Sequence, residues 1–385
     1  MKKLLIGLLT IILLLYLGTI ATGNKFLLTA MARTYLQGHV TANIDDHRAF
    51  DTHTISASAT QPWPIATDFS KVGLPANFLT DLEENSAVAF LVAHKGELLA
   101  EHYMQGYGPD SKTNSFSMAK TIVTLLVGAA IEDGAISGWD QNITTLIPEF
   151  AADPLGKTAS IGSFSTMTSG YDWDEHYYSP MSPTVELYYT DDVTSFVLGG
   201  AFSREPESLH YYSSASTQIL SIALLRALQE SGAADTLSEY LSWKFWKPLG
   251  MNADGQWHTD NRGMELGYCC VNTNARNFAK LGQLLLQKGQ WKGEQLLPES
   301  FIRQITQPVI KPNYGYSTWL SYDKDPKFFA FRGHLGQYIV IAPDHDLVIV
   351  RLGTGTTSDD DPGKDATLRS YVEQAIELIA QRPPD

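Results

Sequence analysis

Residues 337–353 have the sequence QYIVIAPDHDLVIVRLG, in which two apolar runs flank a polar turn around Pro343. Runs of β-branched residues bounded by turn residues are typical of strands, and a short turn between two such runs favours an antiparallel pair. A further apolar run, FFAFRG, lies just before them at 328–333, and residues 364–381 have the length and composition of a helix. The C-terminal part is therefore predicted to be an antiparallel sheet followed by a helix.

A second strand region lies far away in the sequence, where AVAFLVA at 87–93 and LLAEHYM at 98–104 flank a short turn at Gly96. This pattern predicts a hairpin. Helices are expected between the two strand regions, at 118–136, 216–232, 237–251 and 275–289. We therefore predict an α+β domain over residues 71–385, with an antiparallel sheet flanked by helices and a helical insertion at about 150–265.

The N-terminus carries a long uncharged segment, residues 4–24, after Lys2 and Lys3. Such a segment can span roughly 30 Å of hydrocarbon, and the two lysines favour a cytoplasmic N-terminus. Residues 1–25 are predicted to be a transmembrane signal anchor, with a cleaved signal peptide as the alternative. Residues 26–70, which include a short amphipathic helix at 26–37, are predicted to form a juxtamembrane tether. Either reading of the N-terminus places the domain in the periplasm or outside the cell, and the anchor reading makes the chain a single-pass protein of the cytoplasmic membrane.

The composition excludes several function classes. The chain has 385 residues with 28 Lys and Arg against 42 Asp and Glu, a net charge of −14, so no basic surplus exists to bind nucleic acid. Cys269 and Cys270 are the two cysteines, which is too few for a disulfide framework or a Cys-rich metal site. We expect two buried thiols, because bridging adjacent residues would need a strained ring. No metal-binding spacing occurs among the histidines, and neither a metal nor a cofactor is predicted.

The sequence Ser117-Met118-Ala119-Lys120 carries the strongest chemical signal. A Ser and a Lys three residues apart at the start of a helix lie on one face, and the helix N-terminus favours developing negative charge. A buried Lys whose charge is disfavoured can take the proton of the Ser hydroxyl. A second match, from Ser321 to Lys324, lies among polar residues between strand runs, and it is predicted to be a solvated turn.

The chain resembles the penicillin-recognising serine hydrolases, which include class C β-lactamases, D,D-peptidases, related esterases and 6-aminohexanoate-dimer hydrolases. That family has three ordered motifs, matched here by Ser117 to Lys120, Tyr212-Ser213-Ser214 and His334-Leu335-Gly336. Residues 272–298 are similar to a segment of the esterase and 6-aminohexanoate-dimer hydrolase branch. The resemblance covers about 75–380 and implies a β-lactamase/transpeptidase-like fold.

The resemblance also implies roles for individual residues. Ser117 would be the acylated nucleophile and Lys120 its base. Tyr212, its phenolate favoured by the nearby lysine, would pass the proton to the leaving group. The backbone N–H groups of Ser117 and Gln337 would form the oxyanion hole. The residues expected to contact substrate are Ser214, His334, Gly336, Tyr171 and Trp173, the last two from the loop at 169–178, whose aromatic and acidic residues suit neutral or cationic substrates.

Two departures from the family pattern bear on the substrate. Ser214 stands where many relatives have Asn, and His334 stands where β-lactamases and D,D-peptidases have a Lys that holds a carboxylate. A largely neutral His does this less well, so the sequence favours an esterase or amidase that acts on small molecules. The alternatives are a β-lactamase or D-aminopeptidase acting on cell-wall fragments, and a catalytically silent membrane-tethered binding protein.

Overall fold

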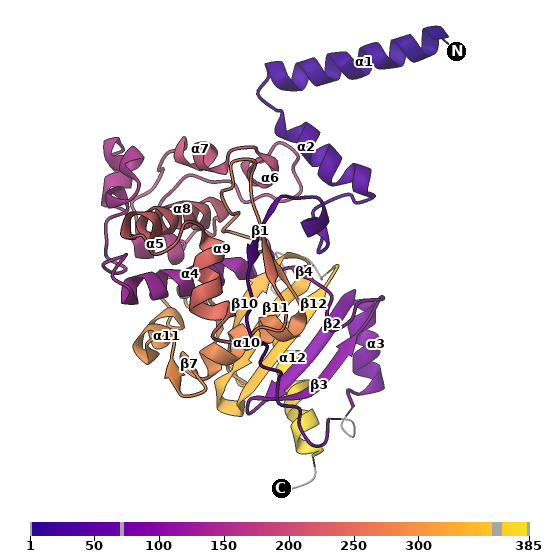
Figure 1. The fold of residues 1–385 in the computed structure, drawn as a ribbon, viewed down its shortest axis with the longest axis vertical. Coiled ribbons are helices and arrows are strands. Elements are labelled where there is room, and N and C mark those ends of the chain that lie inside the picture. The colour runs from indigo at the N-terminus through magenta and orange to yellow at the C-terminus, as the bar shows by residue number, and fades with distance from the viewer. Residues whose placement is uncertain (1, 70–72, 356–363, 383–385) are drawn as a thin grey trace.

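The computed structural model describes residues 2–69, 73–355 and 364–382. Its main sheet has six antiparallel strands, and the N-terminal hairpin lies beside the last strand of the chain (Figure 1). In spatial order the strands are β3 (Glu97–Tyr103), β2 (Ala87–His94), β12 (Leu347–Gly353), β11 (Gln337–Ala342), β10 (Phe328–Gly333) and β9 (Trp319–Ser321). The predicted hairpin and the predicted C-terminal strands are confirmed.

The main sheet is covered on both faces, and the alternation of its side chains separates two cores. Leu347 and Ile349 of β12 pack with the helices α3 (Ala76–Glu84) and α12 (Lys364–Ala380). Val348 and Val350 point to the other face, into the larger core beneath α10 (Ala275–Leu286). Because side chains alternate along a strand, continuous apolar runs are what a sheet buried on both faces requires.

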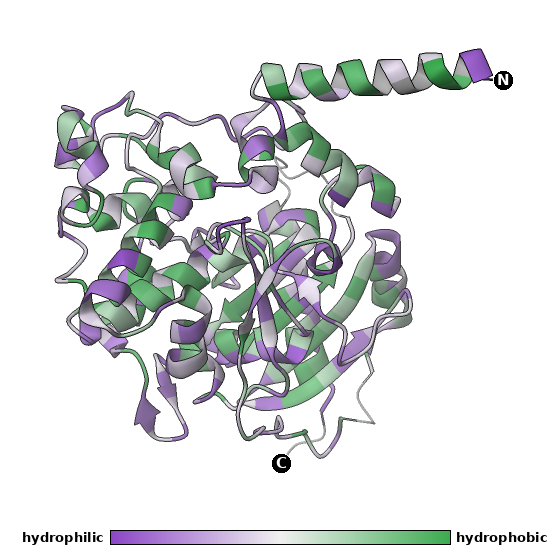
Figure 2. Cartoon of the chain, turned by 45° about the horizontal axis from the view of Figure 1, so that its top comes forward, coloured by the Kyte–Doolittle hydropathy of each residue, from purple (hydrophilic) through white to green (hydrophobic). Residues whose placement is uncertain are grey.

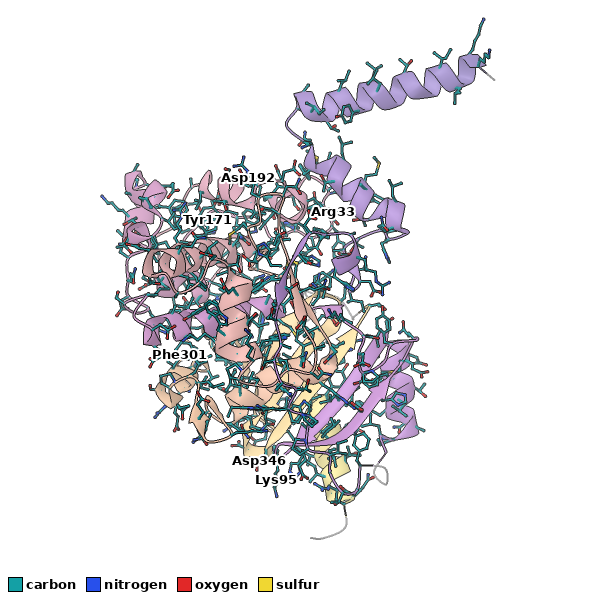
Figure 3. The ribbon with its side chains drawn as sticks, in the orientation of Figure 1. Arg33, Lys95, Tyr171, Asp192, Phe301 and Asp346 are labelled. Carbon is teal, nitrogen blue, oxygen red and sulfur yellow. A yellow bond between two sulfur atoms is a disulfide. The ribbon has the colours of Figure 1, made fainter. Side chains whose placement is uncertain are left out.

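The turns at one end of the sheet meet each other. Lys95, in the turn between β2 and β3, donates its backbone N–H to the carbonyl oxygen of Asp346, in the turn between β11 and β12, at 3.0 Å (Figure 3). Both residues have positive φ, as tight turns between strands require. This hydrogen bond joins the two turns at the end of the sheet that lies away from the helical part of the molecule.

The helical part lies between the two strand regions in sequence and above the sheet in Figure 1. Its helices are α4 (Met118–Glu132), α5 (Ile161–Ser165), α6 (Pro183–Tyr189), α7 (Val193–Leu198), α8 (Ser214–Ser231) and α9 (Leu237–Leu241), which continues into a π-helical turn (Ser242–Trp246). Helix α8 ends at Gly232, which has a φ of +70°, a conformation that glycine adopts without strain. Beyond this part, α11 (Glu299–Ile305) and the small hairpin of β7 (Gln290–Trp291) and β8 (Glu294–Gln295) complete the domain.

The segment predicted to be a tether differs from that prediction, because it is packed onto the domain. It contributes β1 (Thr52–Ile55) to a second sheet, in the order β1, β5 (Gly255–His258), β6 (Val271–Thr273) and β4 (Thr113–Asn114). Its large apolar side chains Phe26, Ile44, Phe50, Ile55 and Trp63 are buried in the main core. Widely spaced apolar residues in a polar segment give no periodic signal, so the sequence did not reveal their burial.

The N-terminal helices α1 (Lys2–Ala21) and α2 (Phe26–Arg33) lie at one side of the helical part, and α1 projects from the body of the molecule (Figure 1). Figure 2 shows that α1 carries many hydrophobic residues. Over the residues that the structure describes, no helix is both long and apolar enough to cross a membrane. The predicted transmembrane anchor at residues 1–25 and the membrane association through it are therefore not supported, and the location of the domain outside the cytoplasm remains a prediction.

The two cysteines form a bond that differs from the sequence-based expectation. Cys269 and Cys270 are joined in a disulfide, and Cys270 has a φ of +78°. Both side chains are buried beside Tyr268 and just before β6. The prediction of two thiols is therefore wrong, since the backbone here adopts the unusual conformation that a bridge between neighbours needs.

Candidate active site

The first motif lies where β4 leads into α4. Phe116 has a φ of +42°, and its backbone N–H donates to the Asn114 side chain at 2.9 Å. Ser115 is tied to Val271 of the neighbouring strand β6 by hydrogen bonds in both directions. A non-glycine residue with positive φ persists only where its surroundings fix it. This turn places Ser117 at the N-terminal end of α4.

Lys120 lies one helical turn after Ser117 and is nearly fully buried, with 1% of its surface exposed. Its Nζ donates to Ser117 Oγ at 3.2 Å, to Ser214 Oγ at 3.1 Å and to the carbonyl oxygen of Tyr268 at 3.0 Å. Burial lowers the pKa of Lys120 to about 8, while the negative charge of Glu175 acts in the opposite direction. The structure therefore brings the serine hydroxyl and a lysine that gives up its proton near neutral pH within hydrogen-bonding distance.

The second motif lies at the N-terminal end of α8, where Ser213 caps the helix by accepting the N–H of Ser216 at 3.1 Å. The centre of the Tyr212 ring lies 5.1 Å from Lys120 Nζ. Burial, and secondarily the charge of Glu175, raise the pKa of Tyr212 above its ordinary value of 10. The predicted phenolate is therefore disfavoured, and the phenol keeps its proton at neutral pH.

Glu175 belongs to the site, and no motif of the sequence points to it. Its carboxylate accepts the N–H of Ser214 at 2.8 Å and the Ser214 hydroxyl at 2.5 Å. The Trp173 indole N–H (2.7 Å) and the Tyr177 hydroxyl (2.8 Å) donate to the same carboxylate. Ser214 thus accepts from Lys120 and donates to Glu175, which forms a continuous chain from the lysine to a carboxylate. The loop at 169–178 was recognised as acidic, but no spacing showed which acid turns inward.

The third motif lies at the end of β10, close to the first. The His334 ring centroid is 5.5 Å from those of both Phe116 and Tyr177. The buried Arg351 donates to the carbonyl oxygens of Leu335 at 3.0 Å and Gly336 at 2.8 Å, which fixes the turn. Gly336 has a φ of +78°, and a Cβ there would lie 1.9 Å from the Arg351 guanidinium, so only glycine fits.

Gln337, which follows the third motif, is buried at the start of β11. Its side-chain amide donates to the carbonyl oxygens of His334 at 3.1 Å and Gly353 at 2.7 Å. These contacts hold the strand beside the turn. The oxyanion hole formed by the backbone N–H groups of Ser117 and Gln337 stays a prediction.

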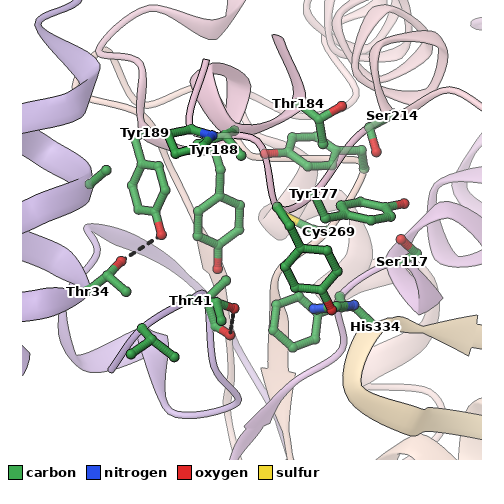
Figure 4. A pocket seen from close by; sticks show the side chains of 18 of the residues that line it. Thr34, Thr41, Ser117, Tyr177, Thr184, Tyr188, Tyr189, Ser214, Cys269 and His334 are labelled. Atoms are coloured by element: carbon green, nitrogen blue, oxygen red, sulfur yellow. Dashed lines mark hydrogen bonds between the residues drawn. The ribbon is translucent and has the colours of Figure 1, made fainter. Parts of the chain in front are cut away.

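A cavity of about 220 Å³ opens at these residues (Figure 4). Ser117, Ser214 and His334 line it, so the three motifs contribute to one space. Tyr171 and Trp173, predicted to contact substrate, are instead buried in the core, where the Tyr171 hydroxyl donates to the Val197 carbonyl at 2.6 Å (Figure 3). In the part of the chain that the structure describes, no group of three or more His, Cys, Asp or Glu side chains could hold a metal ion.

The second Ser-x-x-Lys match has a different environment from the first. Ser321 is the last residue of β9 and is buried, and its Oγ accepts the Arg369 guanidinium at 2.7 Å. Lys324 is exposed in the following turn. The prediction of a solvated turn holds for Lys324 but not for Ser321, which the strand carries inward.

A family model described as Beta-lactamase matches residues 76–374. The chain belongs to this family. It is 24% identical over 306 residues to a 6-aminohexanoate-dimer hydrolase from Paenarthrobacter ureafaciens, covering 72% of this chain and 75% of that protein. A solved structure of a proposed 6-aminohexanoate-dimer hydrolase from Bacillus anthracis has a TM-score of 0.76 at 21% identity, over 88% of this chain and 94% of the other.

A family VIII carboxylesterase also shares the fold, with a TM-score of 0.62 at 17% identity over 82% of this chain and 99% of that one. These structural similarities confirm the predicted β-lactamase/transpeptidase-like fold. The resemblance found in the three motifs is therefore confirmed at the level of the family, the β-lactamase-related serine hydrolases.

Proposed function

We propose that this β-lactamase-related enzyme cleaves ester or amide bonds of small molecules through an acyl-enzyme on Ser117. The observation that carries the proposal is the contact between Lys120 Nζ and Ser117 Oγ at 3.2 Å, made by a lysine whose pKa burial lowers to about 8. A general base works best when its pKa lies near the working pH. Lys120 meets this condition, whereas an exposed lysine is protonated at neutral pH.

In the acylation step, the unprotonated Lys120 takes the proton of the Ser117 hydroxyl as Oγ attacks the carbonyl carbon of the substrate. The carbonyl oxygen gains negative charge, and the proposed N–H groups of Ser117 and Gln337 stabilise it. Tyr212, which keeps its proton because burial raises its pKa, donates that proton to the leaving alcohol or amine. The bond to the leaving group then breaks and leaves the acyl-enzyme.

Deacylation reverses these roles with water as the nucleophile. Tyr212 regains its proton from Lys120, and the free base takes a proton from a water molecule as the water oxygen attacks the acyl carbonyl carbon. The bond between that carbon and Ser117 Oγ then breaks, the acid product leaves, and the proton held by Lys120 returns to Ser117 Oγ. Ser214 contacts Lys120 Nζ, and neither Ser214 nor Glu175 transfers a proton in this scheme. They fix the direction of the Lys120 ammonium through the hydrogen bonds from Lys120 to Ser214 at 3.1 Å and from Ser214 to Glu175 at 2.5 Å.

The preference for esters and amides over β-lactams rests on charge. A β-lactam or peptide terminus carries a carboxylate, which favours a cationic partner. Among the described residues that line the cavity, none is Lys or Arg, and His334 stands at the third motif. The names of a relative, a 6-aminohexanoate-dimer hydrolase, and of a structural neighbour, a carboxylesterase, support cleavage of amide or ester bonds but do not bear on the charge of the substrate. A β-lactamase or cell-wall peptidase is therefore the second candidate.

A labelling and hydrolysis experiment tests the proposal. A fluorophosphonate probe is expected to label the protein on Ser117, as located by mass spectrometry, and Ser117→Ala should abolish both labelling and turnover of p-nitrophenyl acetate. Nitrocefin should be turned over far less efficiently than the ester. A nitrocefin rate equal to the ester rate would favour the β-lactamase alternative, and absence of labelling would favour a silent binding protein.

A further inference from the structure

The cavity at Ser117 extends away from the three motifs toward the N-terminal segment. Figure 4 shows Ser117, Ser214 and His334 at one end of the cavity, and Thr34 and Tyr189 at the other. We propose that residues 27–42 build one wall of a binding site for an uncharged apolar chain of the substrate. This inference rests on the proposed function, since it places the chain beside the scissile bond.

The N-terminal wall combines apolar side chains with three that carry hydroxyl groups, Thr34, Tyr35 and Thr41. Leu27 and Ala30 of α2, with Val40 and Ala42 from the segment that follows, line the cavity. Buried apolar residues on either side, Phe26 and Ile44 among them, anchor the segment in the main core. Residues that precede the family match at 76–374 therefore contribute directly to the space next to the nucleophile.

The position of this wall is fixed by polar contacts as well. Thr34 Oγ1 lies 2.7 Å from the Tyr189 hydroxyl, and Lys25 Nζ lies 2.5 Å from Asp191. The Arg33 guanidinium lies 4.3 Å from the centre of the Phe50 ring. The contacts with Tyr189 and Asp191 hold α2 against the C-terminal end of α6, and the contact with Phe50 holds it against the main core. The wall is therefore part of the folded domain.

A second, adjoining wall comes from residues 177–189 and is rich in aromatic rings. Tyr177, Tyr178, Val185, Tyr188 and Tyr189 line it. The Tyr188 hydroxyl points out of the apolar space, because it donates to the buried Asp46 at 2.8 Å. The Tyr189 hydroxyl is engaged by Thr34. These rings therefore offer mainly their carbon surfaces to a ligand.

The charge pattern of the lining decides the class of ligand. None of the described lining residues is Asp, Glu, Lys or Arg. The carboxylate of Glu175, which contacts the lining residues Tyr177 and Ser214, is occupied by four hydrogen bonds from protein groups. An ammonium or carboxylate entering this space would lose water without gaining an opposite charge, whereas each buried methylene is stabilised by about 0.8 kcal/mol. The site is therefore suited to an alkyl chain.

Two series of substrates test this and show which side of the scissile bond carries the chain. One series is p-nitrophenyl acetate, butyrate, hexanoate and octanoate, and the other is the acetates of alcohols of increasing length. In one of the two series kcat/KM should rise by about fourfold per added methylene, as about 0.8 kcal/mol implies, until the cavity is full. Acetylcholine should be a poorer substrate than its uncharged isostere 3,3-dimethylbutyl acetate. A preference for acetylcholine would overturn the proposal in favour of a cation held by the aromatic rings.

Three variants on α2 test the wall itself: two at residues that line the cavity and one control at an exposed residue. Ala30→Trp fills the cavity and should shift the preference to shorter chains by more than tenfold, while Ala32→Trp, on the exposed side of the same helix, should leave the profile unchanged. Leu27→Ala should extend the preference to longer chains, which keeps the test independent of how well Ala30→Trp folds. An unchanged profile in both cavity variants would overturn the proposal.

A binding measurement separates failure of this site from failure of the proposed function. Octanol titrated into the Ser117→Ala variant should bind, with binding weakened by Ala30→Trp in the same background and unaffected by Ala32→Trp. Binding with this pattern but no ester turnover would overturn the proposed function and support the apolar site. Ester turnover with no chain-length dependence and no octanol binding would support the proposed function and overturn the apolar site.

Discussion

Two buried lysines of this molecule resemble each other in almost every property except their partners. Lys120 on α4 and Lys280 on α10 are 1% and 2% exposed, and burial lowers the pKa of each to about 8. A cavity lies near each: one of about 220 Å³ is lined by Ser117 and Ser214, which Lys120 contacts, and one of about 200 Å³ is lined by Lys280 itself. Burial, a lowered pKa and an adjacent cavity are therefore not enough to identify a catalytic lysine.

The difference lies in the atoms that the two ammonium groups contact. Lys280 Nζ donates to the backbone carbonyl oxygens of Gln61 at 2.6 Å and Gly250 at 2.5 Å, which are acceptors that cannot become nucleophiles. Lys120 Nζ reaches two hydroxyl groups, one of them Ser117 at the N-terminal end of its helix. We infer that Lys280 ties the chain around residue 61 to the domain, and that Lys120 takes part in chemistry.

The largest expected effect comes from replacing each lysine by methionine, which keeps the length of the side chain. Lys120→Met should lower kcat/KM for p-nitrophenyl acetate by about 10² to 10⁴-fold, the usual effect of losing a general base. Lys280→Met should keep kcat/KM within about twofold, because no reacting atom lies near it. Both values are measured by steady-state kinetics on variants whose fold is checked by circular dichroism.

Thermal unfolding of the same two variants serves as the control. Lys280→Met leaves the Gln61 carbonyl without its donor and should lower the melting temperature, whether or not activity changes. If the folded Lys280→Met variant lost as much activity as Lys120→Met, the inference that Lys120 alone of the two lysines takes part in catalysis would be wrong.

A smaller effect is expected from Glu175, which has no counterpart at Lys280. Glu175→Gln cannot accept all four of its hydrogen bonds, so Ser214 and Lys120 should shift. The loss in kcat/KM is expected to be roughly tenfold, which corresponds to about 1.4 kcal/mol. Asp172→Asn, an exposed acid in the same loop, is the charge-matched control and should have no effect.

The pH profile gives Glu175 a signature that a loss of folding would not. Lys120 acts as a base only when unprotonated, so the rate should rise with pH through an apparent pKa near 8. The charge of Glu175 raises the pKa of Lys120, and removing it should move that rise to lower pH. An unchanged or upward shift in the kcat/KM profile would refute the role of Glu175.

Much of the fold was predictable because its elements have strong local patterns. The apolar runs of β2, β11 and β12 are continuous because both faces of the sheet are covered. Ser117 and Lys120 could be paired from sequence alone because helical geometry fixes the separation of residues three apart.

The rest depends on tertiary contacts that no local pattern encodes. Glu175 is one of several acids in its loop, and only the position of α8 turns it toward Ser214. Leu27 and Val40 line the cavity because Lys25 and Thr34 fix the N-terminal segment against residues 189–191. The same reasoning explains why the disulfide was missed, since a bridge between Cys269 and Cys270 depends on the backbone conformation at Cys270.

The smallest effect on activity is expected at the second Ser-x-x-Lys match. A variant there tests whether this motif contributes to catalysis when its lysine is not buried. Ser321 is buried at the end of β9, but Lys324 is exposed, and the Ser321 hydroxyl contacts the Arg369 guanidinium at 2.7 Å. Arg369 keeps its bonds to the carbonyl oxygens of Lys324 and Pro326 when that hydroxyl is removed. Ser321→Ala should therefore leave kcat/KM unchanged and lower the free energy of unfolding by about 1 kcal/mol at most. Fluorophosphonate labelling of this variant should still occur on Ser117. A folded Ser321→Ala protein that is no longer labelled, or an adduct found on Ser321 in the native protein, would show that the pairing of a serine with a buried lysine is not what selects the nucleophile.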